Sequence, residues 1–187
     1  MAQKGIRQYL DKLYKTYNNP QYISTDPVMF LHMNNDPAEY ELLGLIASSL
    51  AYGRVAHICN SVRKVLGCLS LSPECLLETG NKRLKSLFSH FKHRFTTGEE
   101  ISSFFIASKK IYSTYGSLQN CFLSYYKESD TTYIPALTGF VAALRAHSPH
   151  KKFSLLPDPG KKSACKRLHL FLRWMIRKDT IDPGPWS

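Results

Sequence analysis

Apolar residues recur at helical spacing along almost the whole chain, and this periodicity constrains the fold more than any other feature. The first such stretch carries its apolar residues every three or four positions, at Ile6, Leu10, Leu13 and Tyr17. Pro-containing pairs and glycines separate the periodic stretches, and no run of alternating β-branched residues is present. We therefore predict an all-α helical bundle, with helices over residues 6–17, 37–51, 54–69, 97–115, 117–126, 133–147 and 161–178.

The size of the chain fits one domain. Of its 187 residues 43% are apolar, which is enough for a real core, so we predict a single α-helical domain over residues 1–187. The longest uncharged apolar stretch, residues 42–53, is too short to span a membrane, and the first residues lack the apolar segment of a secretion signal. Five cysteines without tight pairs indicate reduced thiols. We expect a cytoplasmic protein with no membrane association and no cofactor.

The charge of the chain is its first functional signal. Lys and Arg number 25 against 14 Asp and Glu, which gives a net charge of +11. The excess is greatest at the C-terminal end, where residues 151–187 carry nine bases and three acids. Such a field favours contact with a polyanion, above all a nucleic acid. The alternative is a basic surface that only keeps the protein soluble.

The C-terminal helix is sharply amphipathic and follows a rigid turn, Asp158-Pro159-Gly160. Its apolar face is predicted to carry Ala164, Leu168, Phe171, Leu172 and Met175. The opposite face is a basic stripe of Lys162, Lys166, His169, Arg173 and Arg177, with no acidic residue on the stripe to balance it. Like charges at this spacing repel one another, and a phosphate would relieve the repulsion. Backbone N–H groups at the turn would also suit a phosphate.

A lysine in such a stripe is a candidate nucleophile. Neighbouring cations and partial burial both disfavour the ammonium form. A neutral amine could attack C1′ of a nucleotide sugar and form a Schiff base. Lys166 is the better candidate on this argument, because it lies one turn past the bend and is flanked by Lys162 and Arg173.

The chain resembles a bacterial family of conserved, uncharacterised proteins that are named only as a domain of unknown function. The matching stretches are DPVMFLHM, ELLGLIASSLAYGRVAHI, FKHRFTTGEE, YGSLQNCF and LLPDPGKKSACKRLHLFLRWMIRKDTIDPGPW, in this order. The family is distantly similar to the helix-hairpin-helix DNA glycosylases, of the archaeal 8-oxoguanine glycosylase type.

This resemblance implies two α-helical lobes around a cleft, with a helix-hairpin-helix element over about residues 134–178. A damaged base of double-stranded DNA would be flipped into the cleft, and a lysine would attack its sugar. Alignment on the hairpin makes Lys162 this lysine, whereas alignment on the following helix favours Lys166, which we prefer. The residues implied to contact DNA are Gly160, Lys161, Lys162, His169, Arg173, Arg177, Tyr52 and Arg54.

The sequence departs from the family in several places. Asp158 and Pro159 replace small, flexible positions of the hairpin, and Pro159 lacks an N–H donor. Family members continue past the residue equivalent to Trp186 into a segment that carries the catalytic aspartate, which this chain lacks. The resemblance thus implies a C-terminally shortened chain, whose activity is in doubt. The clustered cysteines of iron–sulfur relatives are also missing.

Weaker signals lie elsewhere in the chain. Tyr52 and Arg54 fall where glycosylases carry residues that probe the opposite base, although a helix that ends in a glycine cap explains the same pattern. The stretch from His90 to Arg94 extends a basic surface. Two His-x-x-His pairs lack a third ligand, so we predict no metal site.

Three functions remain open from the sequence. The first is a lysine-dependent DNA glycosylase and lyase, or its inactive remnant. The second is a non-catalytic helical module that binds DNA or RNA. The third is a protein-interaction scaffold with no role in nucleic-acid binding, and binding that ignores salt would favour it.

Overall fold

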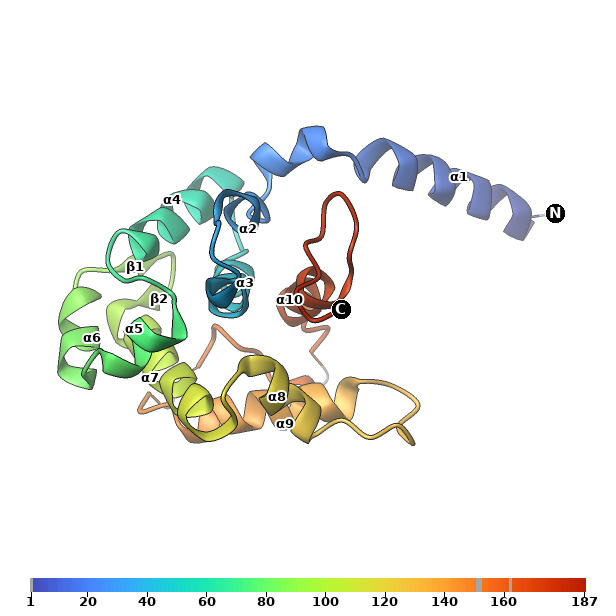
Figure 1. Cartoon of the computed structure of the whole chain (residues 1–187). Helices are drawn as coiled ribbons and strands as arrows, with labels where there is room; N and C mark the ends of the chain where they lie inside the picture. The colour runs from blue at the N-terminus through green and yellow to red at the C-terminus, as the bar shows by residue number, and fades with distance from the viewer. Residues whose placement is uncertain (1, 151–152, 162) are drawn as a thin grey trace.

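The computed structural model describes residues 2–150, 153–161 and 163–187. It confirms the predicted all-α helical bundle, since helices make up the body of the molecule (Figure 1). Its elements are α1 (Ala2–Tyr17), η1 (Pro20–Thr25), α2 (Met29–Met33), η2 (Pro37–Glu39), α3 (Tyr40–Ser49), α4 (Val55–Leu66), α5 (Pro73–Glu78), α6 (Asn81–Leu87), β1 (Lys92–His93), β2 (Thr96–Thr97), α7 (Gly98–Tyr115), α8 (Leu118–Ser124), α9 (Ile134–Ala146), η3 (Pro159–Lys161) and α10 (Lys166–Ile176), where η marks a 3₁₀ helix.

Helix α7 is the longest of these elements within the described residues, and most of its side chains are buried. It begins as the sequence predicts, because the side chain of Thr97 accepts a hydrogen bond from the N–H of Glu100. Glu100 itself connects another segment to this helix. The buried carboxylate of Glu100 accepts hydrogen bonds from the N–H groups of Ser154 and Leu155, which ties the segment after α9 to α7.

Helix α10 packs against α3 in the middle of the molecule (Figure 1). Gly44 allows this close approach, since a Cβ atom at that position would lie 2.6 Å from Cε of Met175. One turn earlier on α3, Glu41 accepts hydrogen bonds from the first N–H groups of α8 and, at 2.8 Å, from the indole of Trp186. The C-terminal segment is thereby held against the core.

Two predicted features of the C-terminal helix are wrong. Helix α10 starts at Lys166 rather than Lys161, because Cys165 takes a left-handed backbone conformation (φ 44°) that interrupts the helix. Ala164 therefore precedes the helix and is exposed instead of packed. The segment between α9 and α10 contains η3 rather than a tight hairpin alone.

The antiparallel hairpin formed by β1 and β2 is an element that the periodicity did not predict. In it Lys92 pairs with Thr97 and His93 with Thr96. Each strand has only two residues, too few to show the alternation that predicts a strand.

Helix α1 extends away from the rest of the molecule (Figure 1). The apolar face that the sequence predicted for it is exposed, and Ile6, Leu10 and Tyr17 lie on it.

Candidate nucleic-acid interface

A hollow of about 730 Å³ lies between α4 and the β1–β2 hairpin. It is lined by Arg54, His57, Asn60, Ser61, Lys64, Lys92, His93 and Arg94. We call it the basic hollow. It combines Arg54, which the sequence singled out as a DNA contact, with the basic stretch that ends at Arg94.

One half of the lining comes from α4, where the helical spacing brings the side chains to one face. His57, Ser61 and Lys64 follow one another at intervals of three or four residues, so they share one face of α4. Arg54 precedes the helix at its N-cap position. Gly53 turns the chain just before it, with a φ of 100° that L side chains rarely adopt.

A buried histidine attaches the hairpin to this face. His93 is 2% exposed, with Nδ1 2.8 Å from the hydroxyl of Ser61 and Nε2 3.2 Å from the carbonyl of Tyr52. A carbonyl only accepts, so Nε2 carries the proton and Nδ1 accepts from Ser61. Burial lowers the pKa of His93 and outweighs the hydrogen bonds to the backbone of Tyr52 and Leu50, which raise it. His93 is thus a neutral structural link rather than a cation of the hollow.

Tyr52 completes the attachment. Its hydroxyl lies 3.0 Å from the carbonyl oxygen of His93 and 2.7 Å from Oγ1 of Thr96, and burial raises its pKa. The guanidinium of Arg167 lies 5.0 Å from the centre of the Tyr52 ring. Arg167 also donates to the carbonyls of Ser49 and Ser154, so the start of α10 is fixed beside the hairpin.

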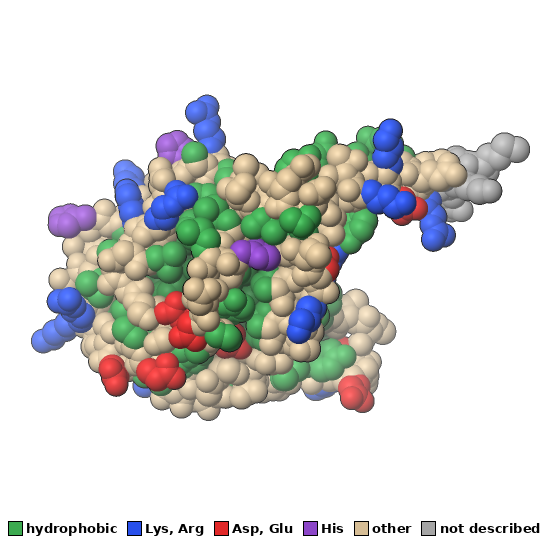
Figure 2. All heavy atoms as spheres, turned by 45° about the horizontal axis from the view of Figure 1, so that its top comes forward, with side chains coloured by type: hydrophobic (Ala, Val, Ile, Leu, Met, Phe, Trp, Pro, Cys, Tyr) green, Lys and Arg blue, Asp and Glu red, His purple; other side chains and the backbone are tan. Residues whose placement is uncertain are grey.

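The charge of the hollow is not compensated by the chain. Its four exposed cations are Arg54, Lys64, Lys92 and Arg94, and none of the residues that line it is acidic. Within the described part of the chain none of the four forms an ion pair. Figure 2 shows basic side chains on the side of α4 and the hairpin, with several carboxylates below them. The hollow is therefore suited to an anion.

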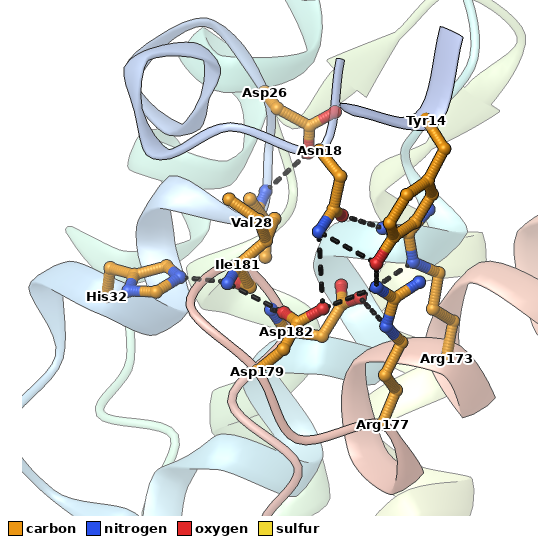
Figure 3. A network of polar contacts seen from close by, with 10 residues as sticks. All are labelled: Tyr14, Asn18, Asp26, Val28, His32, Arg173, Arg177, Asp179, Ile181 and Asp182. Carbon is orange, nitrogen blue, oxygen red and sulfur yellow. Dashed lines mark hydrogen bonds and ion pairs between the residues drawn. The ribbon is translucent and has the colours of Figure 1, made fainter. Parts of the chain in front are cut away.

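The arginines of the predicted basic stripe have a different environment. Arg173 lies 2.8 Å from a carboxylate oxygen of Asp182, and Arg177 contacts both Asp179, at 2.5 Å, and Asp182 (Figure 3). The prediction that no acidic residue balances the stripe is wrong. It failed because the chain folds back after α10, so that residues beyond the helix meet its outer face.

This network also joins three segments of the chain (Figure 3). Asp182 is 1% exposed, and its Oδ1 atom has no hydrogen-bond partner among the described residues. Burial raises the pKa of Asp179, but hydrogen bonds outweigh this, first from the N–H groups of Asp182 and Ile181 and then from Arg177, and lower it to about 2. Tyr14 of α1 accepts a hydrogen bond from Arg177.

The other residues of the stripe, and those of the turn before it, lie apart from this network. Lys166 is exposed at the first position of α10, so the partial burial that the sequence argument assumed is wrong. The ring of His169 lies 3.0 Å from the hydroxyl of Tyr133 and borders a separate, mostly apolar groove. The N–H of Gly160 is bonded to the side chain of Asp158 at 2.9 Å, and Lys161 is exposed beside it. Lys162 lies outside the described residues.

Sequence reasoning missed several residues of the hollow, notably His57, Asn60 and Lys64. The signal was present as polar positions at helical spacing on α4. Without the hairpin that faces them, they are indistinguishable from an ordinary solvated helix face.

Metal-binding and membrane-spanning features are both absent from the described residues. No group of three or more His, Cys, Asp and Glu side chains is placed to hold a metal ion there. None of the described helices is long and apolar enough to cross a membrane.

Comparison with known proteins identified the family alone. Neither the curated proteins nor the solved structures gave a match, so the predicted likeness to DNA glycosylases stays a prediction. The sequence profile described as "Protein of unknown function (DUF2400)" matches residues 26–187, a range that begins after η1. This confirms the predicted membership of an uncharacterised family: the chain belongs to the family described as protein of unknown function (DUF2400).

Proposed function

We propose that this protein binds a nucleic acid through phosphates that enter the basic hollow. The observation that supports this is the set of four exposed cations around one concave surface, without a carboxylate among its lining residues. Phosphates would release the mutual repulsion of these cations and displace their counterions. The net charge of +11 adds a long-range attraction for any polyanion.

The test is a binding titration with a labelled single-stranded oligonucleotide over a range of salt concentrations. We expect the double variant Lys64→Gln/Lys92→Gln to reduce the slope of log affinity against log salt by about 1.4, at about 0.7 for each phosphate that is no longer neutralised. The matched control is Lys12→Gln/Lys15→Gln, which removes the same charge from exposed positions on α1. An equal reduction in both variants would show that only the net charge matters and would reject the hollow as the site.

A second candidate function is base excision through a lysine Schiff base. Its support is position alone: Lys166 is accessible to a large substrate and directly precedes Arg167, whose guanidinium lies 5.0 Å from the centre of the Tyr52 ring, whereas partial burial that would favour the neutral amine is lacking. The amine would attack C1′ of a damaged nucleotide and displace the base.

Borohydride trapping on DNA with an abasic site tests this candidate. A covalent adduct is expected with the unmodified chain and is expected to vanish in Lys166→Gln but to persist in Lys161→Gln. Loss of the adduct only in Lys162→Gln would move the nucleophile to that lysine. No adduct with the unmodified chain would leave phosphate binding as the function.

A further inference from the structure

Phe95 stands at the tip of the β1–β2 hairpin with 63% of its surface exposed. The nearby strand residues His93 and Thr96 have a different environment from Phe95. His93 and Thr96 are buried and hydrogen bonded, so the hairpin itself is fixed. A phenylalanine that is exposed to this extent contributes little burial to the fold. The ring is thus held on the surface by a fixed hairpin, outside the hydrophobic core.

One face of the Phe95 ring is supported by a stack of planar groups. The ring lies 4.8 Å from that of Tyr52, with an interplanar angle of 20°. The guanidinium of Arg167 in turn lies 5.0 Å from the centre of the Tyr52 ring. Both supporting groups are held by hydrogen bonds to neighbouring segments. Phe95 is thus oriented before any ligand arrives, which lowers the entropy cost of stacking on it.

The adjacent residue connects this ring to the basic hollow. Arg94 lines the hollow and takes a φ of 53°, a left-handed conformation that is uncommon for residues other than glycine. Its side chain packs over Gly53, where a Cβ atom would lie 3.0 Å from the guanidinium. Consecutive residues of the hairpin therefore offer a cation that lines the hollow and, directly after it in the chain, an exposed aromatic ring.

We propose that an unpaired nucleobase stacks on the exposed part of Phe95 while the phosphates next to it occupy the basic hollow. This inference rests on the proposed function and specifies its ligand as single-stranded nucleic acid or an unpaired segment. Inside a duplex both faces of a base are covered by its neighbours, so only an unpaired or terminal base offers a face to the ring. Stacking of this kind is largely independent of base identity, so no strong sequence preference is expected.

The experiment compares two labelled oligomers of equal length and charge, an oligothymidylate and an abasic oligomer that has the same sugar–phosphate backbone. We expect Phe95→Ala and Phe95→Leu to weaken binding of the oligothymidylate by about tenfold, the effect typical of one stacked base. Binding of the abasic oligomer should change by less than about twofold, because phosphate contacts remain. Phe95→Leu keeps an apolar side chain, so it separates stacking from simple apolar contact.

Two further variants complete the design. Phe95→Trp should retain the affinity, and its fluorescence should be quenched by the oligothymidylate but not by the abasic oligomer. Tyr9→Ala removes an aromatic side chain of matching exposure (62%) on α1, away from the hollow, and should leave both affinities unchanged. Thermal unfolding of each variant confirms that the fold is kept.

The outcomes separate the inference from the proposed function. Equal weakening on both oligomers, or unchanged oligothymidylate binding in Phe95→Ala, would overturn stacking while phosphate binding stands. If the unmodified protein fails to bind the abasic oligomer at low salt, the phosphate site itself is wrong.

Discussion

The basic hollow and the outer face of α10 are both rich in cations, but the chain supplies carboxylates to only one of them. Arg173 and Arg177 meet Asp179 and Asp182 in the loop that follows their helix. The cations around the hollow have no such partner among the described residues. A count of basic residues therefore does not locate a binding site. What locates it is whether the fold compensates their charge.

The largest expected effect concerns the outer face of α10, where arginines are paired with carboxylates. Asp182→Asn should lower the free energy of unfolding by about 3 kcal/mol, because a buried carboxylate that two arginines contact loses its charge. At roughly 2–4 °C per kcal/mol this is a fall of about 6–12 °C in Tm. Urea and thermal unfolding would measure it.

The matched control for this variant is Asp11→Asn on the exposed part of α1, where a change below about 0.5 kcal/mol is expected. If Asp182→Asn were as stable as the control, the carboxylate would not hold the arginines. They would then have to be counted with the cations that are open to an anion.

Sequence reasoning could predict the helices of this fold but only part of its charge pattern. The periodicity of residues 97–115 and the cap at Thr97 define α7 well, because both signals are local. The start of α10 could not be predicted, since the left-handed conformation of Cys165 has no sequence signature. The assembly of the hollow also depends on tertiary packing, which brings residues 54–64 and 92–94 together.

The pairing on α10 did have a local signal. Asp179 and Asp182 precede Pro183-Gly184, a turn sequence that reverses the chain after the helix. The N–H of Asp179 bonds to the carbonyl of Asp182 at 3.0 Å in this turn. The carboxylates therefore return to the end of α10, and such a turn would have predicted that Arg173 and Arg177 are compensated.

A second, smaller effect on stability is expected at acidic pH and comes from Asp179. Its pKa is lowered to about 2, so the folded protein gains stability from the ionised carboxylate at pH values above the ordinary pKa of 3.8. That stability is lost as the pH falls from about 4 towards about 2. Allowing for screening by solvent, we expect a contribution of about 1 kcal/mol. Urea unfolding at pH 5 and pH 2.5 should show it, and Asp179→Asn should show a correspondingly weaker pH dependence.

The stability of the fold should also depend on pH in a second range, because of His93 beside the hollow. The pKa of His93 is lowered in the fold, so below the ordinary value of 6.5 the unfolded chain binds a proton more readily than the folded protein. Stability is therefore complete above this value and falls as the pH drops towards the lowered pKa. The urea midpoint should decrease between pH 7.5 and pH 5.5, and His93→Gln should show a weaker decrease. His57→Gln, at an exposed position of the same hollow, should keep the decrease of the unmodified protein.

The smallest expected change in stability has the opposite sign to that of Asp182→Asn. Lys64→Gln/Lys92→Gln should leave the free energy of unfolding unchanged or raise it by a few tenths of a kcal/mol, since it removes repulsion rather than attraction. Salt screens this repulsion, so any gain should disappear at about 1 M NaCl. A clear loss of stability in this variant would mean that the lysines of the hollow are engaged in attractive contacts within the fold. The contrast between a compensated and an uncompensated cluster would then fail, and with it the reason to expect an anion in the hollow.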